Sequence, residues 1–168
     1  MTNAGCTMHI DFYSARFTAY QPATSGNEEF CEDLPDTGPT VFVLDYLHPS
    51  LKLVPVDFRI IRNTTGQGRF AQWEDVAALG DLEPLTLYYH PPVIRPDASF
   101  QAEYDFSEKG EYIGIVTAGH PTNDNTYRAV FPFAVGTGRP WLTLAALLLV
   151  ALGLAVWWRG KRKRASTA

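Results

Sequence analysis

Eighteen consecutive residues near the end of the chain carry no charge, and they run from Trp141 to Trp158. A helix of this length spans roughly 27 Å at about 1.5 Å per residue, which is enough for the hydrocarbon core of a bilayer. An arginine flanks each end, Pro140 can open a helix, and tryptophans stand where membrane interfaces favour them. We therefore predict a transmembrane helix over residues 139–159, in preference to a buried core helix.

Basic residues follow the apolar run at once, in the segment Arg159-Gly-Lys-Arg-Lys-Arg164. The positive-inside rule places such a segment in the cytoplasm. Residues 160–168 are therefore predicted to form a short cytoplasmic tail, and residues 1–138 to form a domain on the other side of the membrane. Residues 1–6 lack the basic and apolar regions of a signal peptide, so we expect either a signal already removed or a different start.

Charge is divided unevenly between the tail and the rest of the chain. The whole chain has 14 basic and 18 acidic residues. Five of the basic residues lie between Arg159 and Arg164, so residues 1–158 hold 9 basic and 18 acidic residues, a net charge of about −9. An acidic domain of this kind is not expected to bind nucleic acid.

The segments before the apolar run alternate as β-strands do. In residues 99–106, four apolar side chains alternate with polar ones, as expected for a sheet with one buried face. Pro132 removes a donor from the last strand, which predicts a sheet edge or a bulge there. A short helix is predicted within residues 70–79. Seven strands are predicted, at about residues 8–19, 40–46, 54–62, 85–90, 99–106, 111–118 and 127–135.

Consecutive strands with mostly short connections predict an all-β fold, an Ig-like or cupredoxin-like antiparallel sandwich of two sheets. The segment Phe106-Ser-Glu-Lys-Gly-Glu-Tyr112-Ile-Gly114 resembles the E–F corner of Ig-like domains, in which a tyrosine hydroxyl bonds to nearby backbone. Gly114 stands where those domains often have a cysteine. No disulfide between the two sheets is therefore expected.

With this corner and the terminal apolar run, residues 40–136 resemble bacterial envelope domains of the YtkA/FixH-like and copper-resistance C-like families. The resemblance implies a periplasmic Ig-like module linked to copper handling or oxidase assembly. The chain is then expected in the bacterial inner (cytoplasmic) membrane, with its β domain on the periplasmic or extracellular side. FixH-like proteins carry their helix at the N-terminus, and the C-terminal position here departs from that pattern.

Cys6 and Cys31 are the two cysteines of the chain. Outside the cytoplasm they are predicted to form a disulfide, which would close a loop of about 25 residues and stabilise the fold by ~3 kcal/mol. Two alternatives remain open. Cys6 could carry a lipid, or the thiols could form a metal or redox pair, although no C-x-x-C motif is present.

Four histidines are present, and the predicted strand directions bring all of them to the pole of the sandwich away from the end of the last strand. Imidazole is a ligand for copper and zinc, and a thioether favours Cu(I). A copper site is therefore predicted, the alternative being loop histidines with nothing bound. Its candidate ligands are His9, His48, His90, His120 and Met8.

No catalytic motif is found, so the chain is not expected to be an enzyme. The acidic residues between positions 28 and 36 are expected to form a solvated loop and not a Ca²⁺ site. Phe70 and Trp73 are predicted to bind a partner, the alternative being that they cap the core.

The expected function is that of a membrane-anchored extracytoplasmic accessory or assembly subunit, with the lipid bilayer and the subunits of a copper-using membrane protein complex as partners. The alternative is a periplasmic module that binds or delivers copper.

Overall fold

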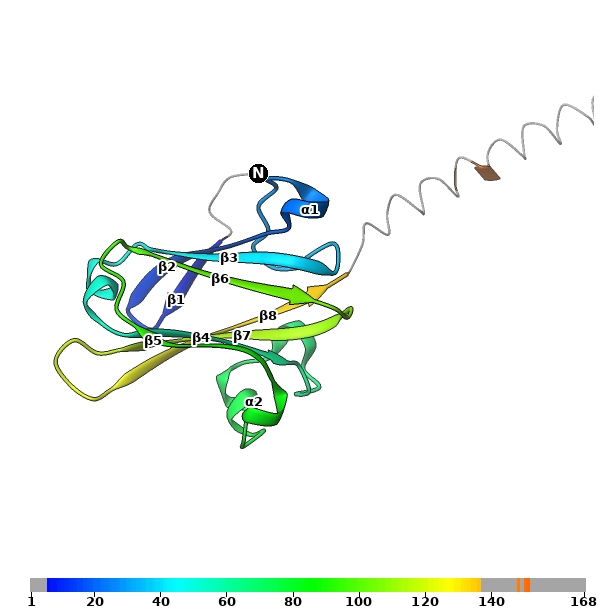
Figure 1. Ribbon diagram of the computed structural model, residues 1–168. Coiled ribbons are helices and arrows are strands. Elements are labelled where there is room, and N and C mark those ends of the chain that lie inside the picture. The colour runs from blue at the N-terminus through cyan, green and yellow to red at the C-terminus, as the bar shows by residue number, and fades with distance from the viewer. Residues whose placement is uncertain (1–5, 137–147, 149, 152–168) are drawn as a thin grey trace, which may run out of the picture. The chain divides into compact units, whose positions relative to one another are not determined.

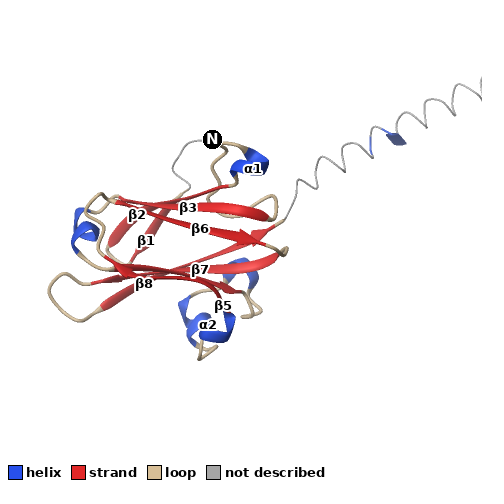
Figure 2. Cartoon of the chain, viewed as in Figure 1, coloured by secondary structure: helices blue, strands red, loops and turns tan. Residues whose placement is uncertain are grey.

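The computed structural model describes residues 6–136 and, further along, Leu148, Val150 and Ala151. Residues 6–136 form an all-β sandwich of two antiparallel sheets, as predicted (Figures 1 and 2). One sheet has the strand order β1-β2-β3-β6, and the other has the order β5-β4-β7-β8. The strands are β1 (Thr7–Ile10), β2 (Tyr13–Tyr20), β3 (Gly38–Tyr46), β4 (Val56–Arg62), β5 (Thr86–Val93), β6 (Ser99–Phe106), β7 (Gly110–Gly119) and β8 (Thr126–Val135).

Five short helices lie in the connections between the strands. The predicted helix within residues 70–79 is confirmed, although it is only five residues long. It begins with a capping box, in which the side chain of Gln72 accepts from the backbone of Asp75 while the Asp75 carboxylate accepts from the backbone N–H of Gln72. The helices are α1 (Pro22–Ser25), η1 (Pro49–Leu53), η2 (Gly68–Phe70), α2 (Trp73–Ala77) and η3 (Glu83–Leu85).

The predicted strand over residues 8–19 is wrong, because the structure divides it into the hairpin β1–β2. Asp11 takes a left-handed backbone conformation (φ 56°), which aspartate tolerates, and the chain reverses between the paired residues Ile10 and Tyr13. The described part of the chain therefore has eight strands instead of seven. β5 also runs past its predicted end at residue 90 and includes two prolines, which a strand at a sheet edge tolerates.

Phenylalanine rings fill much of the space between the two sheets. The Phe58 and Phe131 rings stack with an angle of 4° between their planes and 6.0 Å between their centroids. The Phe17 ring lies 4.1 Å from that of Phe131, so one ring from each of three strands meets at this point. Burying such a side chain contributes about 1.5–3 kcal/mol, and this cluster joins the two sheets.

The predicted tyrosine corner is confirmed. The hydroxyl of Tyr112 donates to the carbonyl oxygen of Glu108 at 2.7 Å, and burial raises the pKa of that hydroxyl. The prediction for Pro132 is also confirmed, because β8 is an edge strand of its sheet.

A second, smaller apolar cluster covers the outer face of the second sheet. Val76 of α2 packs there with Ala71 and with Ile61, Ile113 and Ile115 from β4 and β7. Figure 1 shows α2 on the side of this sheet that faces away from the first sheet.

The predicted transmembrane helix at 139–159 and the predicted tail at 160–168 fall outside the described residues, except for Leu148, Val150 and Ala151, which are helical. Among the residues that are described, no helix has the length and hydropathy needed to cross a membrane. The membrane anchor therefore stays a prediction.

The first testable prediction concerns Gly114. This residue pairs with Phe131 across β7 and β8, and a methyl group on it would overlap the Phe131 ring. Gly114→Ala must therefore displace a ring at the centre of the phenylalanine cluster, and we expect it to lower the free energy of unfolding by about 1–3 kcal/mol. Urea denaturation measures the change. Glu103→Ala, at an exposed position of β6, serves as the control and should stay within about 0.5 kcal/mol of the wild type. Equal stability of the two variants would contradict the packing described.

Candidate functional site

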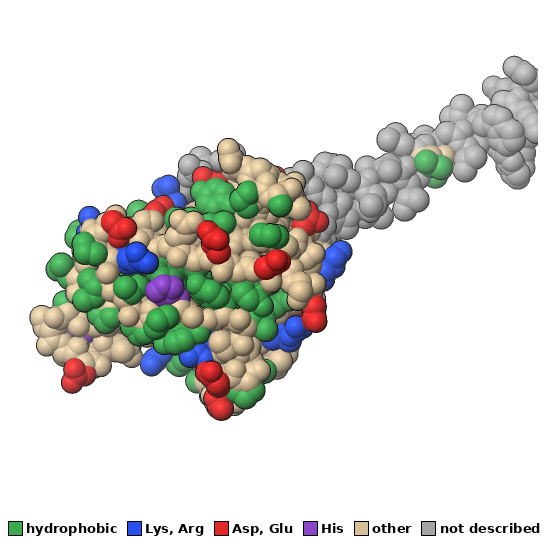
Figure 3. Space-filling model, viewed as in Figure 1, with side chains coloured by type: hydrophobic (Ala, Val, Ile, Leu, Met, Phe, Trp, Pro, Cys, Tyr) green, Lys and Arg blue, Asp and Glu red, His purple; other side chains and the backbone are tan. Residues whose placement is uncertain are grey.

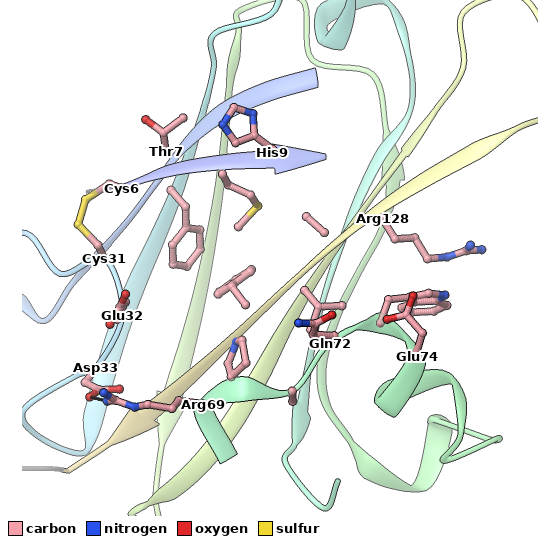
Figure 4. Close-up of a pocket in the computed structure, with 18 residues that line it drawn as sticks. Cys6, Thr7, His9, Cys31, Glu32, Asp33, Arg69, Gln72, Glu74 and Arg128 are labelled. Carbon is pink, nitrogen blue, oxygen red and sulfur yellow. Dashed lines mark hydrogen bonds and ion pairs between the residues drawn. A yellow bond between two sulfur atoms is a disulfide. The ribbon is translucent and has the colours of Figure 1, made fainter. Parts of the chain in front are cut away.

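A groove of about 650 Å³ lies between β1 and β8, which are edge strands of the two sheets. Its volume falls within the range of roughly 300–1,000 Å³ that is usual for ligand sites. Phe17, Ala129 and Phe131 contribute apolar surface to its lining, and the segment before and at the start of α2 contributes Gln72, Trp73 and Glu74. Figure 4 shows the groove with the disulfide and Asp33 toward one end and Arg128 toward the other.

The predicted disulfide between Cys6 and Cys31 is confirmed, and the two Cα atoms lie 4.9 Å apart. Cys31 belongs to a segment that passes from one sheet to the other, which we call the crossing segment (residues 30–34). At its start Phe30 pairs with Ala19 of β2, and at its end Leu34 pairs with Val135 of β8. The disulfide therefore ties the crossing segment to the start of β1, and neither thiol is free.

Asp33 attaches the crossing segment to β8. One carboxylate oxygen accepts from the backbone N–H of Ala134 at 3.0 Å, and the other accepts from Arg69 at 2.8 Å. The prediction of a solvated acidic loop is therefore wrong for Asp33. The reason is that the outward N–H groups of an edge strand need hydrogen-bond acceptors, and the Asp33 carboxylate is the acceptor for one of them. No local sequence pattern could have identified that role, because Ala134 is 101 positions away.

The structure brings two of the four predicted histidines close to the same residue. The rings of His48 and His120 each lie 6.0 Å from the ring of Phe12, which stands in the β1–β2 turn. His90 instead lies in β5, with its ring 4.8 Å from that of Phe100. His9 lies in β1 and lines the groove.

Hydrogen bonds favour one tautomer of the neutral ring in three of these imidazoles. Nδ1 of His48 accepts from the backbone N–H of Ser50, and Nδ1 of His120 accepts from that of Thr122. In the neutral rings the proton is then on Nε2, and ligation through Nε2 would require it to move. His90 is the opposite case. Its Nδ1 lies 2.8 Å from the carbonyl oxygen of Pro91, which can only accept, so in the neutral ring this contact favours the proton on Nδ1.

No three side chains of His, Cys, Asp or Glu within the described stretch lie in position to hold a metal ion. The soft donors nevertheless gather at the groove, since Cys6, Met8 and Cys31 line it together with His9. Cys6 and Met8 are two positions apart along one strand direction, which directs their side chains to the same face. Metal binding by the predicted residues stays a prediction.

Phe70 and Trp73 differ in their surroundings. Phe70 is 77% exposed. Trp73 is partly buried and packs on the outer apolar cluster, while the guanidinium of Arg128 lies 4.8 Å from the centroid of its ring. A second hollow of about 270 Å³ adjoins Trp73 and includes Asp57, whose carboxyl pKa is raised by burial, although hydrogen bonds from Thr117 oppose that shift.

No protein-family model matches this chain, and no curated protein matches it. Among solved structures, the chain is similar to the PmoD soluble domain from Methylocystis sp. ATCC 49242 (Rockwell), with 27% sequence identity and a TM-score of 0.64. The match covers 78% of this chain and 98% of that chain. The sandwich therefore corresponds to nearly the whole of a separately solved domain. The resemblance to the YtkA/FixH-like and copper-resistance C-like families is not confirmed.

The disulfide yields the second testable prediction. Replacing both Cys6 and Cys31 by serine opens a covalent loop with a sequence separation of 25. We expect the free energy of unfolding to fall by about 3 kcal/mol, because the unfolded chain regains conformational entropy. Urea denaturation of the full chain measures the change, and added reductant should destabilise the wild type but not the double variant. Wild-type stability that does not respond to complete reduction would contradict a stabilising bridge.

Proposed function

We propose that this chain is a non-catalytic, membrane-anchored accessory or assembly subunit of a membrane protein complex. The observation that carries the proposal is the similarity to the PmoD soluble domain, which covers 98% of that domain and leaves about a fifth of this chain outside the match. The uncharged run from Trp141 to Trp158 follows shortly after the last strand, which ends at Val135. In this proposal the run anchors the chain in the bacterial inner membrane. The sandwich then lies on the periplasmic or extracellular side, and the basic tail lies in the cytoplasm.

The proposed partner surface is the outer face of the second sheet around α2. Two aromatic side chains there each have an arginine over the ring, and Phe70 lies in η2, shortly before α2 in the chain. The Arg128 guanidinium covers the Trp73 ring, and the Arg59 guanidinium lies 4.4 Å from the centroid of the Tyr89 ring. Tryptophan, tyrosine and arginine are the residue types that most often dominate protein interfaces. Phe70 is the most exposed aromatic side chain of the described residues, so it can be changed without disturbing the core.

A second candidate function is a module that binds or delivers copper, and the contents of the groove favour it. After two-electron reduction of the disulfide by a dithiol reductant, which is itself oxidised to a disulfide, Cys6 and Cys31 would present two thiolates beside the thioether of Met8. Thiolate and thioether ligands select Cu(I). His9 is adjacent in sequence, but strand alternation directs its imidazole to the opposite face of β1. The sulfur ligands fit copper better than His48 and His120 do, because Nδ1 of each of those imidazoles already accepts from a backbone N–H.

Co-purification of the full chain from native membranes in mild detergent tests both candidates and is our third prediction. The accessory role predicts that other membrane subunits co-purify with the chain. Phe70→Ser should reduce their yield severalfold at unchanged thermal stability, because the lost side chain is solvent-exposed. Leu53→Ser is the matched control, since Leu53 is 71% exposed on η1, and it should retain the partners.

Copper analysis of the same preparations separates the two functions. Stoichiometric copper on a chain that purifies alone, lost when Met8 is replaced by Leu, would support the copper module and contradict the accessory role. Co-purifying subunits that depend on Phe70 would support the accessory role.

A further inference from the structure

The backbone of β8 has one side that faces β7 and one side that faces away. The backbone groups of Ala134 point away from β7, because its N–H donates to Asp33 and its carbonyl oxygen accepts from the N–H of Leu34. Ala134 therefore identifies which residues of β8 have outward backbone groups. In an antiparallel strand the backbone groups alternate sides from one residue to the next. The register with β7 continues without a break from Val135 to Thr126. The N–H and carbonyl groups of Val130 and Arg128 therefore point away from β7.

The part of this outer edge nearest the end of β8 is already closed. The crossing segment occupies it at Ala134 and Gly136, whose backbone groups bond to Leu34, and the ion pair between Asp33 and Arg69 lies alongside. Pro132 has an outward position but no N–H to offer. The crossing segment thus shows that the edge accepts an added strand, and it leaves the stretch from Arg128 to Val130 uncovered.

The uncovered stretch borders the groove, whose lining includes every residue from Arg128 to Pro132. No hydrogen bond to the outward backbone groups of Arg128 or Val130 is formed by any residue that the structure describes. Natural sheets usually block such edges with charge, proline or a covering loop. Here proline and the covering segment block one half of the edge only.

The side chains along this edge also alternate. Ala129 and Phe131 face the core between the sheets, whereas Val130 packs on the outer cluster and Arg128 lies over Trp73. A strand added beside them would alternate in the same way. It would place apolar side chains toward Phe17 and Phe131 and polar ones toward the outer face.

Charge distinguishes the two ends of the groove. Arg128 forms no ion pair with any other described residue, although Figure 4 shows Glu74 toward the same end. Glu32 lies at the opposite end, beside the disulfide, where Arg69 is already paired with Asp33. Positions 128 and 132 of β8 are separated by about 13 Å at roughly 3.3 Å per residue. An extended segment with an acidic side chain facing Arg128 and a basic one four residues away would complement both ends.

We propose that the groove binds an extended segment of a partner protein, which adds as a strand to the outer edge of β8 at Arg128–Val130. The segment alternates apolar and polar residues and carries an acidic residue at the Arg128 end and a basic residue at the Glu32 end. That the partner is a subunit of a membrane protein complex follows from the accessory role proposed above. The binding site is inferred independently, from the outward backbone groups of Arg128 and Val130.

The test uses the purified full chain in mild detergent and a fluorescein-labelled peptide, Ser-Lys-Val-Thr-Val-Glu-Ser, blocked at its C-terminus. Val130→Pro removes one outward N–H, and Pro132 shows that a proline fits an outward position of this strand. We expect binding measured by fluorescence anisotropy to weaken at least tenfold in this variant. Arg128→Glu should weaken binding by about two- to fivefold, as expected for one cross-strand charge pair, and should not weaken binding of a peptide with glutamine at both charged positions.

Two N-methylated peptides guard against a variant that fails to fold. One peptide is methylated at the backbone nitrogens that would face β8, and the other at the nitrogens that would face away. The first should not bind and the second should bind normally, because only one set of N–H groups bonds to β8. Equal binding of both methylated peptides, or tight binding by a folded Val130→Pro variant, would overturn the inference. Dimers of the chain that Val130→Pro dissociates would overturn it as well, because the edge would then be occupied by a second copy. Failure of the accessory role would look different, since the peptide would bind while no subunits co-purified.

Discussion

The two sheets depend on the crossing segment for their connection on the β1–β8 side. This segment pairs with β2 at one end and with β8 at the other, and the disulfide fixes its middle to the start of β1. Asp33 adds two hydrogen bonds, one to the backbone of β8 and one to Arg69. A few residues therefore set how far the two edges separate, and this separation determines the size of the groove.

The opposite side of the sandwich, between β5 and β6, is filled by aromatic side chains. Tyr88 lies 6.1 Å from Tyr104, and His90 packs against Phe100. Figure 3 shows apolar side chains gathered in a band across the middle of the face in view. This contrast explains the position of the groove. Bulky rings fill the space between β5 and β6, whereas β1 and β8 are connected at one end only, by the disulfide and the Asp33 carboxylate.

Much of the fold could be predicted from the sequence, because it depends on local patterns. Alternation in residues 99–106 gave the correct strand bounds, Pro132 correctly indicated an edge, and the Gly-x-Tyr pattern placed the Tyr112 hydroxyl on backbone. The turn at Asp11 was missed, since the apolar pattern continues through it. The groove was missed as well. It depends on Asp33 meeting Ala134 and on two edges lying side by side, and such long-range contacts leave no signal in a single sequence.

The crossing segment closes the edge of β8 only in part. Residue-resolved hydrogen exchange of the full chain tests this partial closure directly, because exchange reports whether each backbone N–H is hydrogen-bonded. We expect fast exchange at Arg128 and Val130, and slow exchange at Ala129, Phe131 and Ala134, whose N–H groups have partners in β7 or in Asp33. Protection at Arg128 and Val130 equal to that of Ala129 and Phe131 would contradict partial closure.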